Sequence, residues 1–121
     1  MKSILLVEDD PFIVDIYKTK FREAGFSVEV AFSGGECLKK LKEKKPDLLL
    51  LDLCLPEVEG WEIIKTVKKS ESLKNLPIII LSNLSQKQEV DKAINLGAER
   101  YLIKAHYTPS EVIEEIKSIL K

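Results

Sequence analysis

Four short runs made entirely of apolar residues constrain the fold of this 121-residue chain more than any other feature. They occupy residues 4–7, 48–51, 78–81 and 101–103. A strand with no polar position has to be buried on both faces, which is typical of a parallel sheet covered by helices. The runs therefore predict four strands of a parallel sheet that is covered by helices on both faces.

The segments between these runs carry the signals of helices and of one more strand. Apolar residues recur at helical spacing after Asp10, which we expect to cap a helix that begins at Pro11 and stops at Gly25. The expected buried positions of this helix are Ile13, Ile16, Tyr17, Phe21 and Ala24. Residues 27–32 carry larger apolar side chains at every second position, which predicts an edge strand.

Three pairs of residues have the spacing of a capping box, in which each side chain bonds a free backbone N–H of the other: Ser33 with Glu36, Ser85 with Gln88, and Thr108 with Glu111. They predict three further helix starts, and Trp61, Ile64 and Val67 predict another helix after Gly60. Five strands alternating with five helices fit a single α/β domain over residues 1–121, built on a doubly wound parallel sheet.

The composition is that of a soluble globular protein, with 45% apolar residues, 32% charged residues and a formal net charge of -1. This balance gives no general attraction to nucleic acid or anionic membranes, and no apolar run is long enough to cross a bilayer. We interpret the lysines within residues 39–45 as a solvated helix face. Cys37 and Cys54 are expected to be free thiols, and the lack of a secretory signal favours a cytoplasmic location.

Five polar residues directly follow the apolar runs: Glu8, Asp9, Asp52, Ser82 and Lys104. Parallel strands end at one edge of a sheet, where open α/β folds bind ligands, so we expect these side chains to meet. Carboxylates gathered there repel unless a cation relieves them, and hard oxygen ligands suit Mg²⁺. We expect Asp9 and Asp52 to bind the ion directly and Glu8 to act through water. The backbone carbonyl of Cys54 is the further expected ligand.

The same cluster predicts a chemistry. A carboxylate beside a bound cation can attack phosphorus and form an acyl phosphate. Asp52 meets these conditions as the residue that follows the run at 48–51. Lys104 can hold a second phosphoryl oxygen as a point charge, and Ser82 can donate a hydrogen bond to a third.

These residues give the chain a resemblance to the receiver domain of bacterial two-component response regulators. The resemblance covers essentially the full length, and the matching segments are residues 6–10, 51–53, 55–60, 81–82 and 101–104. It implies a flavodoxin-like (βα)5 fold with strand order 2-1-3-4-5. It also implies that Asp52 is the phosphoacceptor of a phosphorelay, that Mg²⁺ is the cofactor, and that Ser82 and Tyr101 switch together.

The resemblance further implies the partners. A sensor histidine kinase or phosphotransfer protein would supply the phosphoryl group, and the surface around the fourth helix, fifth strand and fifth helix would contact a downstream protein in trans. No direct contact with nucleic acid or membrane is expected, and the last two helices could form a dimer. Such a domain is a signalling switch that promotes its own phosphorylation and dephosphorylation, not an enzyme acting on other substrates.

The sequence departs from the family pattern at two positions. Asn83 stands where a small alanine is usual, so it either narrows access to Asp52 or itself bonds the phosphoryl group. Ala105 stands where a proline with a cis bond is usual. A cis bond before alanine costs about 2.5–4 kcal/mol, so we expect a trans bond that places Lys104 differently. Cys54 and Leu84, near the entrance, offer no general base, which predicts slow self-dephosphorylation.

Three other functions fit the sequence less well. The departures at Asn83 and Ala105 are compatible with a receiver-like scaffold that binds partners without being phosphorylated. A phosphatase with an aspartate nucleophile usually needs a second acid two residues later, where this chain has Cys54. A flavin-binding module needs a phosphate loop after the first strand, where residues 8–10 are acidic and would repel phosphate.

Overall fold

A computed structural model describes residues 1–120 of the chain and contains one five-stranded parallel sheet with the strand order β2-β1-β3-β4-β5. The strands are β1 (Ser3–Val7), β2 (Ser27–Ala31), β3 (Leu48–Leu51), β4 (Ile78–Ser82) and β5 (Arg100–Ile103). The predicted fold class and strand order are therefore confirmed. The predicted edge strand ends one residue early, because Phe32 already lies beyond β2 and is 45% exposed.

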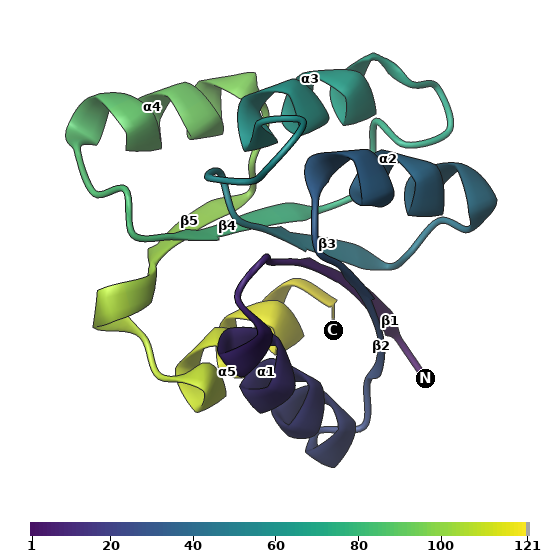
Figure 1. Cartoon of the computed structure of the whole chain (residues 1–121), viewed down its shortest axis with the longest axis vertical. Coiled ribbons are helices and arrows are strands. Elements are labelled where there is room, and N and C mark those ends of the chain that lie inside the picture. Colours follow the sequence, from purple (N-terminus) through teal and green to yellow (C-terminus); the bar gives the residue numbers. More distant parts are fainter. Residues whose placement is uncertain (121) are drawn as a thin grey trace.

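Five α-helices alternate with the strands and cover both faces of the sheet, as Figure 1 shows. They are α1 (Pro11–Glu23), α2 (Gly34–Glu43), α3 (Gly60–Lys69), α4 (Lys87–Leu96) and α5 (Pro109–Leu120), with a short 3-10 helix, η1 (Lys104–His106), after β5. Helices α1 and α5 lie on one face, and α2, α3 and α4 lie on the other. Within residues 1–120, no helix is both long enough and apolar enough to span a bilayer.

Burial on both faces explains the uninterrupted apolar runs. In β3, Leu49 and Leu51 point into the core beneath α2, α3 and α4, whereas Leu48 and Leu50 point into the core beneath α1 and α5. All four side chains are fully buried. Successive strand residues face opposite sides of the sheet. In a strand between two helix layers, a polar side chain at any position would therefore be buried at a cost in free energy.

The caps predicted at the starts of the first and the last helix form as expected. Asp10 accepts a hydrogen bond from the Phe12 N–H at 2.9 Å and so caps α1. Before α5, Thr108 Oγ1 accepts from the Glu111 N–H at 3.1 Å, while Glu111 accepts from the Thr108 N–H at 2.8 Å. This reciprocal pair is a complete capping box.

The other two predicted capping boxes differ from expectation. Ser33 caps α2 by accepting from the Glu36 N–H at 3.1 Å, but Glu36 reaches back to the Phe32 N–H at 2.6 Å instead of to Ser33. The prediction for Ser85 with Gln88 is wrong. Helix α4 begins at Lys87 after Gln86, which makes no side-chain cap, so Ser85 lies one residue too early to cap it.

The buried face of α1 also differs from the prediction in one position. Val14, Tyr17 and Phe21 are its buried residues, whereas Ile16 is 48% exposed. The spacing of three and four residues between the buried positions defines a narrow stripe toward the sheet, and Ile16 falls on its flank. Sequence periodicity alone did not distinguish a stripe that includes Val14 from one that includes Ile16, since both residues are aliphatic.

The correction to α1 can be tested by two substitutions on the same helix. We expect Val14→Ala to lower the free energy of unfolding by about 2 kcal/mol, because Val14 is 2% exposed and its methyl groups leave a cavity. Ile16→Ala should change it by less than about 0.5 kcal/mol, as for other surface positions. Urea denaturation measures both. Equal losses would contradict the observed orientation of α1.

Candidate functional site

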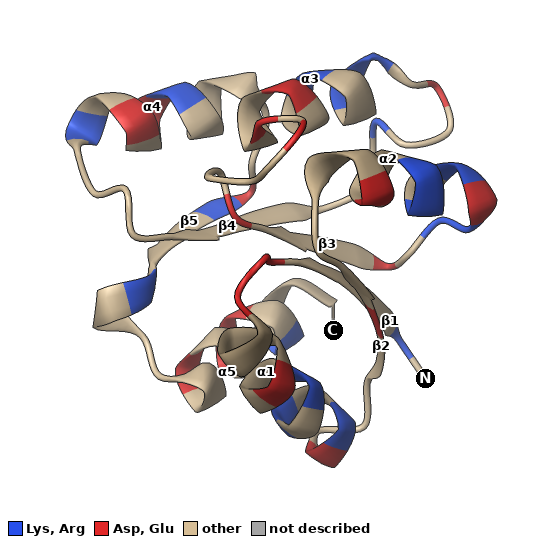
Figure 2. Cartoon of the chain, viewed as in Figure 1, with Lys and Arg blue, Asp and Glu red and all other residues tan. Residues whose placement is uncertain are grey.

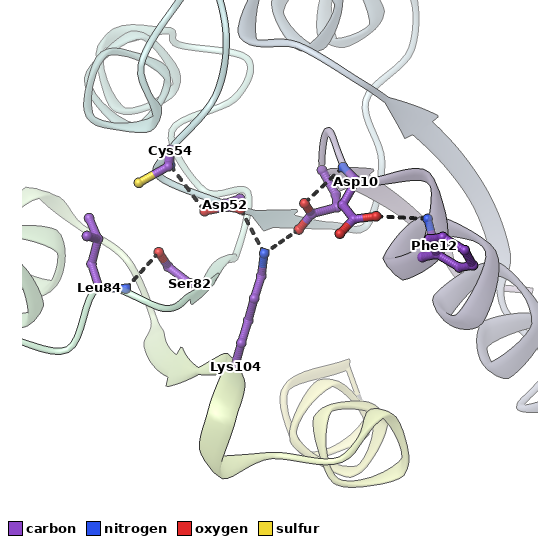
Figure 3. Close-up of polar contacts among 8 residues, drawn as sticks. Asp10, Phe12, Asp52, Cys54, Ser82, Leu84 and Lys104 are labelled. Carbon is purple, nitrogen blue, oxygen red and sulfur yellow. Dashed lines mark hydrogen bonds and ion pairs between the residues drawn. The ribbon is translucent and has the colours of Figure 1, made fainter.

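The polar residues that follow the apolar runs meet at the carboxyl edge of the sheet. Val7 of β1 pairs with Leu51 of β3, so the next residues, Glu8 and Asp52, end neighbouring strands at the same level. Ser82, the last residue of β4, pairs with Ile103 of β5. Lys104 therefore follows at the same edge, and Figure 3 shows its side chain extending toward Asp52.

Three carboxylates from two strand ends form a compact acidic group. Glu8, Asp9 and Asp52 each offer an oxygen, and these oxygens lie within 4.8 Å of one another. Glu8 and Asp52 are buried, at 2% and 7% exposure, whereas Asp9 is exposed. Figure 2 marks the acidic stretch between β1 and α1 to which Glu8 and Asp9 belong. Hard oxygen donors with one open side suit a small divalent cation that keeps some of its waters, so these residues fit Mg²⁺.

Lys104 joins the two buried carboxylates. Its Nζ lies 2.7 Å from Glu8 Oε2 and 2.8 Å from Asp52 Oδ2. The Lys104 side chain is only 16% exposed, so solvent screens these ion pairs much less than a surface pair. One ammonium thus offsets the repulsion between two acids that the sheet forces together.

Backbone amides bind the remaining oxygens of the same two carboxylates. The Asp10 N–H donates to Glu8 Oε1 at 3.2 Å, and the Cys54 N–H donates to Asp52 Oδ1 at 3.1 Å. Each acid is therefore fixed by Lys104 on one oxygen and by a neighbouring loop on the other. The orientation of Asp52 depends on the β3–α3 loop, residues 53–59, as well as on Lys104.

The environment shifts the proton affinities of this cluster. Burial raises the pKa of Glu8 above its ordinary value of 4.5, although Lys104 pulls it in the opposite direction. Burial alone would lower the pKa of Lys104, but its bonds to Asp52 and Glu8 outweigh that effect and raise the pKa above 10.5. Lys104 is therefore fully charged at neutral pH.

Ser82 and Tyr101, the predicted switch residues, are linked through the backbone of Leu84. The Leu84 N–H donates to Ser82 Oγ at 3.3 Å, and Tyr101 donates from its hydroxyl to the Leu84 carbonyl at 2.6 Å. Ser82 is 1% exposed and Tyr101 is half-buried against the core under α3 and α4. Leu84 thus lies between the two side chains, with one hydrogen bond to each.

The positions where the sequence departs from the family pattern lie at the rim of the site. Asn83 is exposed, and so is Cys54, which is not one of these departures but lies at the same rim. The bond before Ala105 is trans, and Ala105 lies within η1. Lys104 nevertheless reaches Asp52 at 2.8 Å, so the missing proline does not withdraw the ammonium from the carboxylate.

Sequence reasoning missed the contacts that hold the acids in place. It assigned Lys104 to a phosphoryl oxygen and did not foresee that the ammonium bridges Glu8 and Asp52. It also treated Asp10 only as a helix cap, whereas the Asp10 N–H donates to Glu8. Every residue except proline has a backbone N–H, so residue type cannot indicate which backbone groups donate. The ion pair could have been inferred, because the strand ends carry more acidic than basic residues.

Comparison with protein families agrees with this geometry. A family model described as the response regulator receiver domain matches residues 4–117. The polar-differentiation response regulator DivK of Brucella ovis is 34% identical over 119 residues, which cover 98% of this chain and 96% of DivK. The alkaline phosphatase synthesis transcriptional regulatory protein PhoP of Bacillus subtilis is 35% identical over 122 residues, which cover 99% of this chain.

The lengths of the relatives differ. The chain spans 49% of PhoP, and it spans 50% of the DNA-binding dual master transcriptional regulator RpaA of Synechocystis, to which it is 30% identical. Among solved structures, the CheY-like response regulator receiver domain protein of Methanospirillum hungatei superposes with a TM-score of 0.91 at 31% identity. That match covers 99% of this chain and 94% of the other.

The Lys104 bridge predicts a pH-dependent loss of stability in Lys104→Met. Removing the ammonium leaves two buried acids unpaired, so the free energy of unfolding should fall by roughly 1–3 kcal/mol at pH 7. The raised pKa of Glu8 means that the folded state binds its proton more tightly than the unfolded chain does. Protonated Glu8 therefore favours the folded state below pH 4.5. This contribution to stability is lost as the pH rises through the pKa that Glu8 has in the folded protein.

Lys104→Met should raise the pKa of Glu8 further, so the loss of stability should be larger at pH 7 than at pH 4. Denaturation curves at both pH values check this, with Lys117→Met as the control, because Lys117 forms an exposed pair with Glu114. A loss that does not depend on pH would show that Lys104 does not control the charge of the buried acids.

Proposed function

Because the chain belongs to the response regulator receiver domain family, we propose that it is a phosphorylation-dependent signalling switch in which Asp52 accepts the phosphoryl group. The observation that carries this proposal is the arrangement around Asp52. A buried carboxylate is held by Lys104 at 2.8 Å and lies beside two further acids, Glu8 and Asp9, at the open edge of the sheet. This arrangement supplies a nucleophile, a cation and a metal-binding group at one place.

The proposed reaction is transfer from a phosphohistidine. An oxygen of the Asp52 carboxylate forms a bond to phosphorus while the phosphorus–nitrogen bond breaks, and the electron pair stays on the imidazole nitrogen, which takes up a proton. Asp52 attacks through a carboxylate oxygen beside the Lys104 ammonium, so the reaction requires no separate general base. The reaction therefore depends on position and charge, as phosphoryl transfers generally do.

Lys104 and the acids divide the electrostatic work. The Lys104 ammonium turns from the carboxylates to a phosphoryl oxygen, where it acts as a point charge. Asp9, Asp52 and the Cys54 backbone carbonyl would hold Mg²⁺ directly, and Glu8 would act on it through water. When bound, Mg²⁺ neutralises charge that develops on the transferring phosphoryl group. The fit of the donor set supports this assignment, since all the side-chain donors are carboxylate oxygens.

The proposed switch uses the Ser82–Leu84–Tyr101 connection. A phosphoryl group adds about -1.5 to -2 charges and new acceptor oxygens beside Ser82. When the Ser82 hydroxyl turns to donate to it, the Leu84 N–H loses its acceptor and the Leu84 carbonyl no longer holds Tyr101 in place. The surface of α4, β5 and α5 is then remodelled. Asn83, exposed at the rim, is an additional candidate to bond the phosphoryl group.

The partners follow from the same proposal. A sensor histidine kinase or phosphotransfer protein delivers the phosphoryl group in the cytoplasm, and a downstream protein reads the α4–β5–α5 surface in trans, without direct contact to nucleic acid or membrane. Dimerisation through α4 and α5 is a further proposed use of that surface.

We propose that residues 1–121 form a single receiver domain. The relatives DivK and PhoP, whose names describe regulators, support a signalling function.

Mass spectrometry of the intact protein tests the proposed phosphoacceptor. We expect exposure to acetyl phosphate and Mg²⁺ to add one phosphoryl group to the native chain and none to Asp52→Asn. Asp9→Asn keeps the nucleophile but loses a direct metal ligand, so its labelling at limiting Mg²⁺ should fall at least about tenfold. Asp15→Asn, on the exposed side of α1, is the matched control and should behave like the native chain.

An adduct that persists in Asp52→Asn would assign the acceptor to another residue. A native chain that takes no phosphoryl group under conditions that label other receiver domains would favour the scaffold function. The phosphatase alternative predicts rapid turnover of a phosphomonoester without an accumulated adduct.

The rim of the site predicts slow loss of the phosphoryl group. Although Cys54 is exposed, partial desolvation of its thiol and the nearby Asp52 charge raise the pKa of the thiol, so it is neutral and a poor base at pH 7. We expect Cys54→Asn, whose amide can orient a water by hydrogen bonds, to hydrolyse the aspartyl phosphate several-fold faster. The decay of the adduct after removal of acetyl phosphate measures this. Equal or slower decay in Cys54→Asn would contradict the role assigned to Cys54.

A further inference from the structure

Two glycines donate backbone hydrogen bonds to the β3–α3 loop: Gly60 at the start of α3 closes its two ends, and Gly34 of α2 holds its middle. Gly60, at the start of α3, donates from its N–H to the Leu53 carbonyl at 3.1 Å. Gly34, at the start of α2, donates from its N–H to the Pro56 carbonyl at 3.3 Å. The loop that supplies the Cys54 N–H to Asp52 is therefore attached to the N-terminus of α2.

Gly34 has no space for a side chain. A Cβ added at this position would meet the Val58 carbonyl oxygen, and it would lie 2.7 Å from Val58 Cβ and 2.9 Å from the Val58 carbonyl carbon. These are mostly backbone atoms, which cannot swing aside as the end of a long side chain can. The absence of a side chain at Gly34 thus lets the loop lie directly against α2.

The neighbouring Gly35 provides a contrast. A Cβ there would lie 2.5 Å from Glu57 Oε1, and the next nearest atom is 3.5 Å away. Glu57 is exposed and its carboxylate ends a flexible side chain, so it can move at little cost. Two adjacent glycines in one helix turn therefore differ in one respect: only the first touches the backbone of the loop.

The loop, not α2, has to yield when Gly34 gains a side chain. Helix α2 is fixed in the core by Cys37 and Leu41, at 0% and 5% exposure. In the loop, Pro56 and Glu57 are exposed, and Glu57 has a positive φ of 70°, a conformation that non-glycine residues seldom adopt. The Val58 N–H also bonds the Pro56 carbonyl at 2.9 Å across Glu57, so the turn is tight and strained.

We infer that Gly34 is a positioning residue for the phosphorylation site: it holds the β3–α3 loop against α2 so that the Cys54 backbone stays in bonding distance of Asp52. The route runs from Gly34 to the Pro56 and Val58 carbonyls, then back along the loop to Cys54 and to Asp52 Oδ1, 3.1 Å from the Cys54 N–H. The part of this inference that concerns Mg²⁺ rests on the proposed function, and the part that concerns the Cys54–Asp52 bond does not.

Gly34→Ala and Gly35→Ala form the test pair, and NMR provides two measurements. In the metal-free protein, the Cys54 amide resonance should shift in Gly34→Ala and its hydrogen exchange should quicken at least about tenfold, while both stay near native values in Gly35→Ala. In a titration with Mg²⁺ followed by the same amides, Gly34→Ala should bind roughly ten- to one-hundred-fold more weakly, the usual cost of losing a residue that supports metal ligands. Gly35→Ala should bind as the native chain does.

A purely structural role for Gly34 would lower global stability and leave the Cys54 amide and the Mg²⁺ affinity of the folded protein unchanged, and that result would overturn the inference. If Gly34→Ala does not fold, Val58→Gly loosens the same contact from the loop side, and an unchanged Cys54 amide there would also overturn it. If the native chain does not bind Mg²⁺ but the Cys54 amide still responds to Gly34→Ala, the proposed function is contradicted. The positioning role of Gly34 is supported by the same result.

Discussion

The structure of the site depends on the ion pairs that Lys104 makes with Glu8 and Asp52. The parallel sheet places two buried carboxylates at the ends of neighbouring strands, where they would repel strongly in a weakly polarisable environment. Lys104 directly follows β5, which lies two strands away from β3 and about 10 Å distant at ordinary strand spacing. The strand between them ends in the small residue Ser82, so the long Lys104 side chain can cross to Asp52.

This arrangement makes the cluster responsive to charge. Glu8, Asp9 and Asp52 bring three carboxylates together beside one ammonium, so Lys104 offsets only part of their charge. An added cation at the exposed Asp9 side would improve the balance, and a phosphoryl group would give Lys104 a new partner. The acids are therefore held in place by contacts that a ligand can exchange, while the leucines and isoleucines of the strands beneath them supply the stability.

The sequence was sufficient to predict the elements that rest on apolar pattern. Unbroken runs such as residues 48–51 can be satisfied only between two helix layers, and the residues after them necessarily share one edge of a parallel sheet. The apolar pattern did not determine which face of α1 is buried, because Ile16 and Val14 are both aliphatic and only the packing selects Val14. The cap expected at Ser85 failed because a spacing motif does not specify where a helix begins.

The contacts that orient the site were beyond prediction for a different reason. The Cys54 and Asp10 amides, the Leu84 backbone and the Gly34–Pro56 bond all use main-chain groups that every residue possesses. Their use depends on the path of the loops, which is set by close approaches such as Val58 against Gly34. Residue type identified the polar groups that meet at the edge of the sheet, and loop geometry decides how they are held.

A crystal structure of the chain with Mg²⁺ and beryllofluoride, a stable mimic of a phosphoryl group on a carboxylate, tests the account most directly. We predict beryllium on Asp52, Mg²⁺ bound by Asp9, Asp52 and the Cys54 carbonyl, and the Lys104 ammonium on a fluorine. Ser82 should donate to another fluorine and no longer accept from Leu84. Beryllofluoride bound elsewhere, or Lys104 still bridging Glu8 and Asp52 beside an occupied site, would contradict the account.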